Sequence, residues 1–383
     1  MALFKTPEYT LIGSKALEEA KPYLKKCGKK ALIVTGKHVV LSDMMAELKK
    51  ALEEIGIAYF VFDGITGEPT NVMIDEGIAA YKENGCDFCI GIGGGSPLDS
   101  AKAIAAMITN EGKIADYNGK VIEKPIPPVV AIPTTAGTGS EATQFTVITD
   151  VEKDIKMLLK GGYLVPKIAI VDPAYTYSAP KSITAATGMD ALTHALEAYT
   201  SRKALPVTDT LAVSAVKRIM KYLPAAYKDG SDEKARYEMS VASYEAGICI
   251  NNSTVTLVHG MSRPIGALFH VAHGISNAML LTKCLAFALD GAYEKFANLG
   301  REIGAATAED DDKTASEKFI EALNEICKIC EIPTLLEYGI PKDEFFAHME
   351  KMAHDALTSG SPGNTMKPIS EQDIIEIYKK LWE

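Results

Sequence analysis

Four side chains in the second half of the chain are of the types that bind a catalytic metal. Asp190 and His194 lie four residues apart in GMDALTHALEAY, so on a helix they project from one face and can share a cation. His259 and His273 follow in LVHGMSRPIGALFHVAHG, on either side of a predicted helix break at 264–266 that lets two segments approach one point. One carboxylate and three imidazoles suit Fe(II), Zn(II) or Co(II), and a set without cysteine argues against a structural zinc.

Two glycine-rich segments in the first half are typical of phosphate-binding loops. In GGGSPLDSAKAIA, Gly93 to Ser96 form a predicted tight turn before a helix that starts near Pro97. Glycines let backbone N–H groups approach an anion, and a helix N-terminus adds partial positive charge. A second segment, PTTAGTGSE at 133–141, follows another predicted strand. Either segment alone could be only a tight turn, but two at the carboxyl ends of strands predict a nucleotide site.

A metal and a dinucleotide together favour hydride transfer. A metal polarises an alcohol or carbonyl oxygen, and a nicotinamide exchanges the hydride. The chain contains neither a nucleophile-elbow serine motif nor a Walker phosphate loop, which argues against acyl transfer and ATP hydrolysis.

Two domains should position these groups. Over residues 1–180, apolar runs alternate with helical patterns, which predicts a Rossmann-like α/β domain with a doubly wound, mostly parallel sheet. From about Lys181 the strand patterns stop, which predicts an all-α domain over 181–383, with a TxxE capping box from Thr314 to Glu317. The predicted strands are 30–36, 58–63, 87–93, 128–133 and 168–172, and the predicted helices of the first domain are 14–26, 42–55, 71–84 and 98–108.

The overall composition points to a small-molecule ligand. The 383 residues are 47% hydrophobic and 23% charged, with a formal net charge of −10, which disfavours a nucleic acid or an anionic membrane as partner. The apolar segment 267–289 contains His270, His273 and Lys283, so we expect a buried core segment lining a site and not a membrane span.

The cysteines and the N-terminal residues favour a reducing cytoplasm. The cysteine count is odd, and the two C-x-x-C pairs, Cys86/Cys89 and Cys327/Cys330, fall in apolar patterns that predict packing in place of redox or zinc chemistry. The N-terminal residues show no export signal, so we expect a cytoplasmic protein.

The motifs resemble the signatures of iron-containing (group III) alcohol dehydrogenases. The resemblance rests on GGGSPLDSAKAIA, PTTAGTGSEAT, GMDALTHALEAY, HGMSRPIGALFHVAHGISNAMLL and the SPGN at 361–364, and it covers nearly the whole chain. It implies a dehydroquinate-synthase-like architecture, a homo-oligomer (a dimer or larger), and NAD(H) or NADP(H) in a cleft between the domains. It also implies that Asp190, His194, His259 and His273 are the metal ligands, with Fe(II) usual and zinc in some relatives.

The resemblance also assigns cofactor contacts by matching motifs. Gly94, Gly95, Ser96 and Asp99 would contact the pyrophosphate and the nearby ribose, Thr134, Thr135 and Thr138 the phosphate and nicotinamide side, and Lys156 a cofactor hydroxyl. His270 would either lie next to the metal ligands without binding the metal or have no part in the site.

Two departures from the family pattern bear on specificity. Relatives restricted to NAD carry an Asp where this chain has Gly36 followed by Lys37, so a 2′-phosphate could fit there and the choice between NAD and NADP stays open. Arg263 replaces a histidine of many relatives, which places a histidine proton relay in doubt. Our hypothesis is that Arg263 contacts a substrate that bears a carboxylate, sulfonate or phosphate; the alternative is a structural pair with a carbonyl or a carboxylate.

The sequence therefore predicts a metal-dependent alcohol dehydrogenase or aldehyde reductase acting on a small alcohol or aldehyde. The alternatives are an NAD- and metal-dependent lyase of the dehydroquinate-synthase type and a non-catalytic sensor of metal and nucleotide.

Overall fold

The computed structural model describes residues 3–383, which form two compact units. The first unit ends at Ala179 and the second begins at Pro180. In the described part of the chain, no helix combines the length and the apolar character that crossing a membrane requires.

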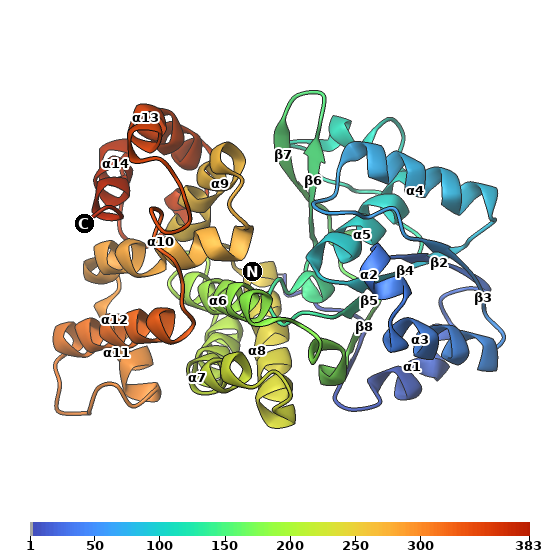
Figure 1. Ribbon diagram of the computed structural model, residues 1–383, viewed down its shortest axis with the longest axis horizontal. Helices are drawn as coiled ribbons and strands as arrows, with labels where there is room; N and C mark the ends of the chain where they lie inside the picture. Colours follow the sequence, from blue (N-terminus) through green and yellow to red (C-terminus); the bar gives the residue numbers. More distant parts are fainter. Residues whose placement is uncertain (1–2) are drawn as a thin grey trace. The chain divides into compact units, whose positions relative to one another are not determined.

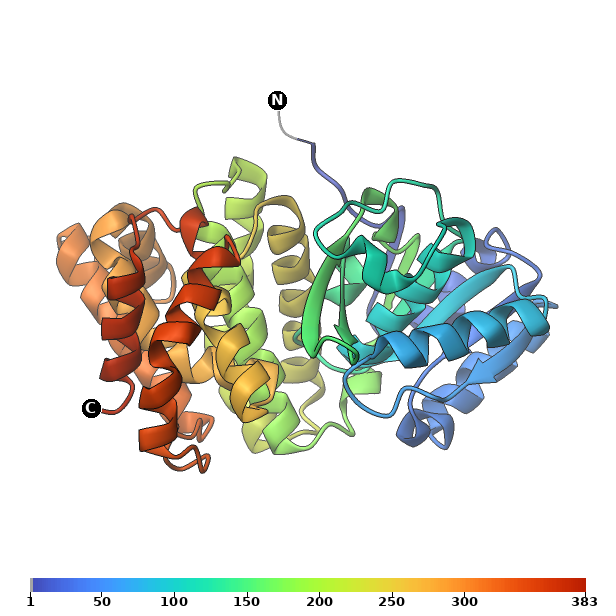
Figure 2. The ribbon, with the colours of Figure 1, turned by 90° about the horizontal axis from the view of Figure 1, so that it is seen from above.

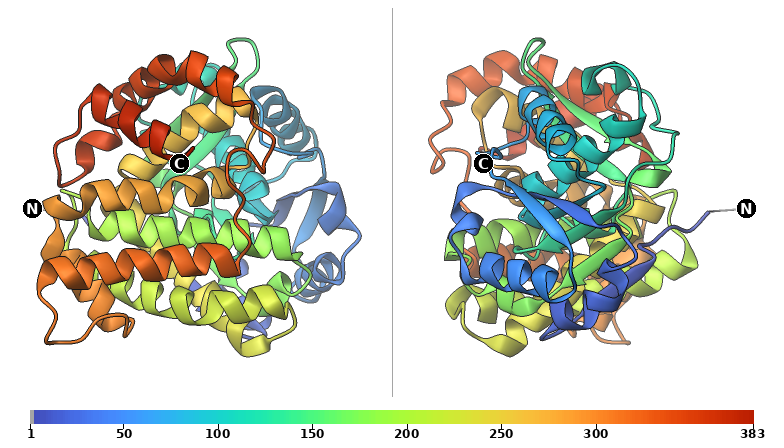
Figure 3. Two further views of the ribbon diagram at one scale, coloured as in Figure 1. Left: turned by 60° about the vertical axis from the view of Figure 1, so that its left-hand side comes forward. Right: turned by 90° about the vertical axis from the view of Figure 1, so that its right-hand side faces the viewer.

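A six-stranded parallel sheet forms the centre of the first unit, in the order β1-β8-β5-β4-β2-β3 (Figure 1). Its inner strands are almost fully buried, as expected of a parallel sheet covered on both faces. The strands are β1 Tyr9–Ile12, β2 Lys30–Val34, β3 Ala58–Phe62, β4 Phe88–Gly93, β5 Val129–Pro133 and β8 Ile168–Val171. The right panel of Figure 3 shows this sheet from another direction.

Helices cover the two faces of this sheet. Ala31 and Ile33 of β2 pack in one core with α1 (Ala16–Leu24) and α3 (Asp43–Glu54). Leu32 and Val34 point the other way, into a second core with α4 (Asn71–Glu83) and α5 (Gly95–Thr109). The period of two along the strand therefore divides its side chains between two helical layers.

The predicted doubly wound α/β domain is confirmed, although three strands were missed. They are the edge strand β1 and the antiparallel pair β6 (Phe145–Asp150) and β7 (Ile155–Lys160). Shorter elements of this unit are α2 (Lys37–Val40) and the 3-10 turns Ile114–Tyr117, Ser140–Ala142, Gly162–Leu164 and Pro173–Thr176.

The second unit is helical, as predicted, and residues 180–383 contain no strand. Its long helices run alongside one another (Figure 3, left), and α13 and α14 (red) lie side by side (Figure 2). The helices are α6 Lys181–Tyr199, α7 Pro206–Lys228, α8 Glu233–Asn252, α9 Leu257–Phe269, α10 His273–Ala288, α11 Tyr293–Glu302, α12 Asp312–Ile329, α13 Lys342–Thr358 and α14 Glu371–Lys380, with 3-10 turns at Leu289–Gly291 and Pro362–Asn364.

The predicted helix break at 264–266 was wrong. Helix α9 continues through Pro264 to Phe269, and the chain turns at His270, which adopts a left-handed φ of 52°. The Tyr378 hydroxyl donates a buried hydrogen bond of 2.7 Å to the Met261 carbonyl, so tertiary contacts brace the helix where the proline weakens it. The apolar segment 267–289 is therefore two helices joined by a turn.

The predicted capping box from Thr314 to Glu317 was also wrong. Helix α12 already begins at Asp312, and the Asp311 carboxylate accepts a hydrogen bond of 2.7 Å from the Thr314 backbone N–H. Asp311 is an equally good N-cap that lies three residues earlier.

The cysteines of the two C-x-x-C pairs are free thiols. Cys89 is buried in β4 and Cys86 is buried just before that strand, and burial raises the pKa of Cys327 and of Cys330 to about 12. Such thiols are unreactive, which agrees with the predicted packing role.

Candidate metal centre and cofactor loops

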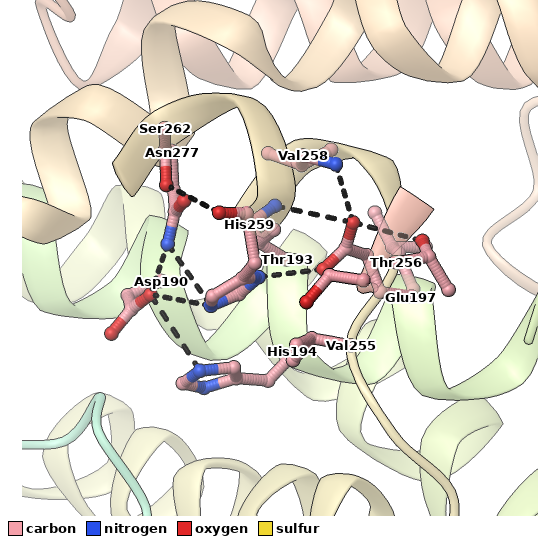
Figure 4. A network of polar contacts seen from close by, with 12 residues as sticks. Asp190, Thr193, His194, Glu197, Val255, Thr256, Val258, His259, Ser262 and Asn277 are labelled. Carbon is pink, nitrogen blue, oxygen red and sulfur yellow. Dashed lines mark hydrogen bonds and ion pairs between the residues drawn. The ribbon is translucent and has the colours of Figure 1, made fainter. Parts of the chain in front are cut away.

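The four predicted metal ligands meet around one oxygen atom of the second unit. Helix α6 places Asp190 and His194 one turn apart, α9 contributes His259, and α10 begins with His273. The Nε2 atoms of His194, His259 and His273 lie 3.8, 3.7 and 3.8 Å from Oδ1 of Asp190 (Figure 4 shows the first two contacts). Asp190, His194 and His259 are buried, and His273 is the most exposed of the four.

This arrangement fits a divalent cation. A carboxylate oxygen of Asp190 and one ring nitrogen each of His259 and His273 all lie within 4.8 Å of one another, and His194 is not part of this tighter group. Two ligand atoms that each lie about 2.0–2.2 Å from a tetrahedral cation are roughly 3.5 Å apart. We call the side chains of Asp190, His194, His259 and His273 the ring, and they would have to move only slightly closer together to bind one cation. Nδ1 of His194 and Oδ1 of Asn277 are buried polar atoms without a hydrogen-bond partner. The ligand assignment itself stays a prediction.

The electrostatics of the ring favour the protonation states that bind a metal. Burial alone would raise the pKa of Asp190, but the neighbouring imidazoles outweigh burial and the pKa lies below its usual value. Burial lowers the pKa of His259 well below its usual value, and repulsion from the other two imidazoles lowers it further. An ionised carboxylate and a neutral imidazole are the forms that ligate cations.

Two buried residues beside the ring were not predicted. The Asn277 amide nitrogen donates a hydrogen bond of 2.7 Å to Oδ1 of Asp190 and lies 3.2 Å from Nε2 of His259. The Glu197 carboxylate lies 2.6 Å from Nδ1 of His259. Both belong to motifs already noted, ALTHALEAY and HGISNA, but nothing in the sequence distinguishes them from ordinary helical residues.

Arg263 lies one helical turn after His259 and is half-buried. Its Nη1 donates a hydrogen bond of 3.0 Å to the Ser361 hydroxyl, in the SPGN segment. Among residues 3–383, no carboxylate forms an ion pair with this guanidinium. The buried Glu197 carboxylate attracts this charge without forming an ion pair with it. His270 is exposed and ends α9.

The first glycine loop joins β4 to α5. Gly94 caps the helix, which begins at Gly95, two residues before the predicted start at Pro97. Gly93 has a φ of 147°, which only glycine adopts readily. The first N–H groups of a helix have no intrahelical acceptor, so those of Gly95 and Ser96 are suited to an anion.

The second glycine loop lies against the first. The Thr134 N–H donates a hydrogen bond of 2.8 Å to the Gly93 carbonyl, and a Cβ on Gly95 would lie 2.9 Å from the Thr138 methyl group. Thr135 is the nearest neighbour of Gly94, since a Cβ there would lie 3.7 Å from its side chain. The structure thus brings these predicted cofactor residues together within the first unit.

Asp99 is already engaged within the protein, and its neighbour Lys102 was not predicted. Oδ1 of Asp99 accepts a hydrogen bond from the Ser140 hydroxyl at 2.5 Å, and Oδ2 accepts one from the Val147 N–H at 2.8 Å. Lys102 is fully buried, and its Nζ donates to Ser140 and Thr143 at 2.8 and 3.2 Å. In the structure, Asp99 therefore ties the second loop to α5.

The remaining predicted cofactor residues, Gly36 and Lys156, belong to other elements of the first unit. Gly36 caps the short helix α2, and the next residue, Lys37, is exposed. A Cβ at Gly36 would lie 2.8 Å from the Ile65 carbonyl oxygen, which explains the glycine. Lys156, on β7, forms an ion pair of 2.5 Å with Glu68.

Comparison with known proteins decides the family. The model of iron-containing alcohol dehydrogenases matches residues 7–173, and the model of the C-terminal part of the Fe-containing alcohol dehydrogenase family matches residues 184–382. The chain belongs to the iron-containing alcohol dehydrogenase family. The predicted resemblance is thereby confirmed, and neither model is that of a dehydroquinate synthase.

Other members of this family match the chain along nearly its whole length. The NAD-dependent methanol dehydrogenase of Bacillus methanolicus is 38% identical over 382 residues, which cover 99% of each chain. The crystal structure of a 1,3-propanediol oxidoreductase is 34% identical, with a TM-score of 0.95 and complete coverage of both chains. Sulfoacetaldehyde reductase from Bifidobacterium kashiwanohense, solved with NAD+, is 28% identical, with a TM-score of 0.88, covering 100% of this chain and 98% of that one.

Proposed function

We propose that the protein interconverts a small alcohol and its aldehyde, with NAD(H) or NADP(H) as the hydride carrier and a divalent metal, Fe(II) or Zn(II), in the ring around Asp190. The observation that carries the proposal is the convergence of three imidazole nitrogens on Oδ1 of Asp190, each within 3.8 Å. Family membership and the NAD-dependent relative support the reaction class.

Each group has a separate role in this proposal. Asp190, His194, His259 and His273 hold the metal, which when bound supplies Lewis acidity toward the substrate oxygen. The N–H groups of Gly95 and Ser96, with the threonines of the second loop, bind the cofactor phosphates. Asp99 and Lys102 keep the two loops together, and Lys156 together with Gly36 adjoins the cofactor riboses.

We further propose that the substrate carries an anionic group that Arg263 binds. The support is that this guanidinium forms no ion pair among residues 3–383 and donates a hydrogen bond to the neutral Ser361 hydroxyl. A guanidinium binds carboxylate and sulfonate groups through paired hydrogen bonds. A relative named for sulfoacetaldehyde is consistent with this substrate class. Because Arg263 does not titrate near neutral pH, water or a ribose hydroxyl would move the alcohol proton.

Either nicotinamide cofactor is compatible with position 36. Gly36 offers no carboxylate to repel a 2′-phosphate, and the exposed Lys37 adds a positive charge beside it. The NAD-dependent relative favours NAD(H). We propose that both are used. A homo-oligomer and a cytoplasmic location stay predictions from the sequence.

The decisive experiment measures consumption of NADH and of NADPH by metal-free protein reloaded with Fe(II) or Zn(II), against matched neutral and anionic short aldehydes. We expect turnover only with metal, and none in Asp190→Ala. Arg263→Gln should lower kcat/KM for anionic aldehydes by about tenfold or more and leave neutral ones nearly unchanged. Equal losses for both aldehyde classes would refute the anion proposal alone, whereas turnover without any metal would refute the metal centre.

A further inference from the structure

Glu197 is a fully buried carboxylate one turn beyond His194 on α6. Its Oε1 accepts hydrogen bonds from the Thr256 hydroxyl at 2.8 Å and the Val258 N–H at 2.6 Å. Its Oε2 lies 2.6 Å from Nδ1 of His259 (Figure 4). A buried carboxylate with this many donors is held in one orientation.

This contact decides which nitrogen of His259 carries the proton. An ionised Glu197 carboxylate has only acceptors, so Nδ1 of His259 is the donor in the pair. In a neutral imidazole the other nitrogen is then unprotonated. Nε2 is therefore free to accept, and it lies 3.2 Å from the Asn277 amide nitrogen and 3.7 Å from Oδ1 of Asp190.

His194 differs from His259 in this respect. Its Nδ1 is buried and has no hydrogen-bond partner, so no group among residues 3–383 fixes its tautomer. The two imidazoles lie nearly parallel, with ring centroids 4.8 Å apart. Of these two ligands, His259 is held in the tautomer that can bind a cation, and His194 is not held in either tautomer.

We propose that Glu197 is a positioning residue, which presets the tautomer and orientation of His259 and thereby determines how tightly the ring holds its metal. This inference rests on the proposed function, because it assumes that the ring binds a cation. Carboxylates behind ligating histidines change metal affinity by about 10- to 100-fold in other sites.

Glu197→Gln tests the proposal with little change of shape. The amide oxygen can replace Oε1 toward Thr256 and Val258, but the NH₂ group then faces Nδ1 of His259 as a donor. His259 must respond by carrying its proton on Nε2, which blocks the ligating lone pair. We expect metal-free Glu197→Gln to bind Zn(II) and Co(II) about 10- to 100-fold more weakly than the unmodified chain, measured by competition with a chromophoric chelator.

The tautomer provides a readout that does not depend on metal. Nitrogen-15 NMR of labelled histidines in the metal-free protein should show His259 protonated on Nδ1 in the unmodified chain and on Nε2 in Glu197→Gln. The unmodified chain alone can decide this point if the variant fails to fold. A proton on Nε2 in the unmodified chain would overturn the proposal.

Three further variants separate positioning from general damage. Thr256→Val removes one donor to Oε1 but leaves the His259 contact, so affinity should stay within about threefold. Glu245→Gln, at another largely buried helical carboxylate of this unit, should leave metal affinity unchanged. In a His259→Ala background, Glu197→Gln should have no further effect, because the two residues act as one unit.

The outcomes distinguish this inference from the proposed function. Equal affinity of Glu197→Gln and the unmodified chain, or additive losses with His259→Ala, would overturn the role of Glu197 alone. If the unmodified chain binds neither metal, the proposed metal centre fails, and the role of Glu197 in metal retention fails with it.

Discussion

The Ser140 hydroxyl donates a hydrogen bond of 2.5 Å to Oδ1 of Asp99, although 41 residues separate the two in the sequence. Ser140 also accepts a hydrogen bond from the buried Lys102 ammonium group at 2.8 Å. These contacts fasten the second glycine loop to α5, the helix that begins at the first glycine loop. The relative placement of the two loops therefore depends on the buried charged cluster of Asp99 and Lys102.

Loss of this cluster should weaken cofactor binding. We expect Lys102→Met to lower the free energy of unfolding by about 3–5 kcal/mol, because Asp99 is left without its buried counter-charge. In the protein that stays folded, the Kd for NADH should rise by about tenfold or more, measured by fluorescence titration. Lys153→Met, at an exposed lysine of the β6–β7 turn, is the control and should change neither quantity. An unchanged Kd for NADH in Lys102→Met would refute the positioning role.

Glu141 should make stability fall as the pH rises. Burial raises its pKa to about 7, with its own backbone N–H and the Lys102 charge acting in the opposite direction. The folded protein then holds this proton more tightly than the unfolded chain does. The stabilisation is full below the unfolded pKa of about 4.5 and is lost as the pH rises through 7.

Replacing Glu141 by Gln should remove this dependence. Relative to the unmodified chain, Glu141→Gln should gain about 1–3 kcal/mol of unfolding free energy at pH 8 and much less at pH 5. Urea denaturation at both pH values measures the difference, and Glu152→Gln, at an exposed glutamate, serves as the control. If the unfolding free energies of Glu141→Gln and the unmodified chain differ by the same amount at pH 5 and pH 8, the assignment of the pH dependence to Glu141 is wrong.

Gly260 should tolerate no side chain. A Cβ there would lie 2.6 Å from two ring carbons of Pro362, which belongs to the SPGN segment. Gly260→Ala should cost about 1–3 kcal/mol of stability and lower Tm, because the proline ring cannot move aside. Gly266→Ala, in the same helix, meets its nearest atom at 3.4 Å and should be neutral or slightly stabilising. Equal Tm values for the two variants would show that the Pro362 contact is unimportant.

The side chain of Lys37 should affect the KM for NADPH but not the KM for NADH. If the 2′-phosphate lies beside Gly36, Lys37→Ala removes an exposed cation from it and should raise the KM for NADPH by about three- to tenfold. NADH has no 2′-phosphate, so the KM for NADH should not change. Lys120→Ala, at another exposed lysine, controls for the loss of one surface charge. Parallel changes for both cofactors would place the phosphate elsewhere.

The fold could be predicted where burial is uniform along an element. Strands such as β4 and β5 are fully buried and form continuous apolar runs, which the sequence displays directly. Strands β6 and β7 were missed because burial and polarity do not match along them: Thr146 and Asp150 are buried, whereas Ile155 and Leu158 are exposed. The edge strand β1 has only four residues, none of them fully buried.

The candidate site could be predicted where spacing carries the information. Asp190 and His194 are four residues apart on one helix, so their convergence follows from helix geometry. Glu197 continues the same helix, but helical glutamates are usually solvent-exposed, and only the tertiary structure reveals that this one is buried behind His259. Asn277 was missed for the same reason.

The helix that carries His259 is supported by segments that the ribosome makes much later. Arg263 is bonded to Ser361, 98 residues downstream, and Met261 to Tyr378, 117 residues downstream. A nascent chain that has exposed all four metal ligands therefore still lacks these two contacts to α9. We expect the cation to be captured late, after the C-terminal helices have emerged. Ribosome-bound chains stalled before Ser361 should retain far less Co(II) than chains released at full length, and equal retention would contradict this order of assembly.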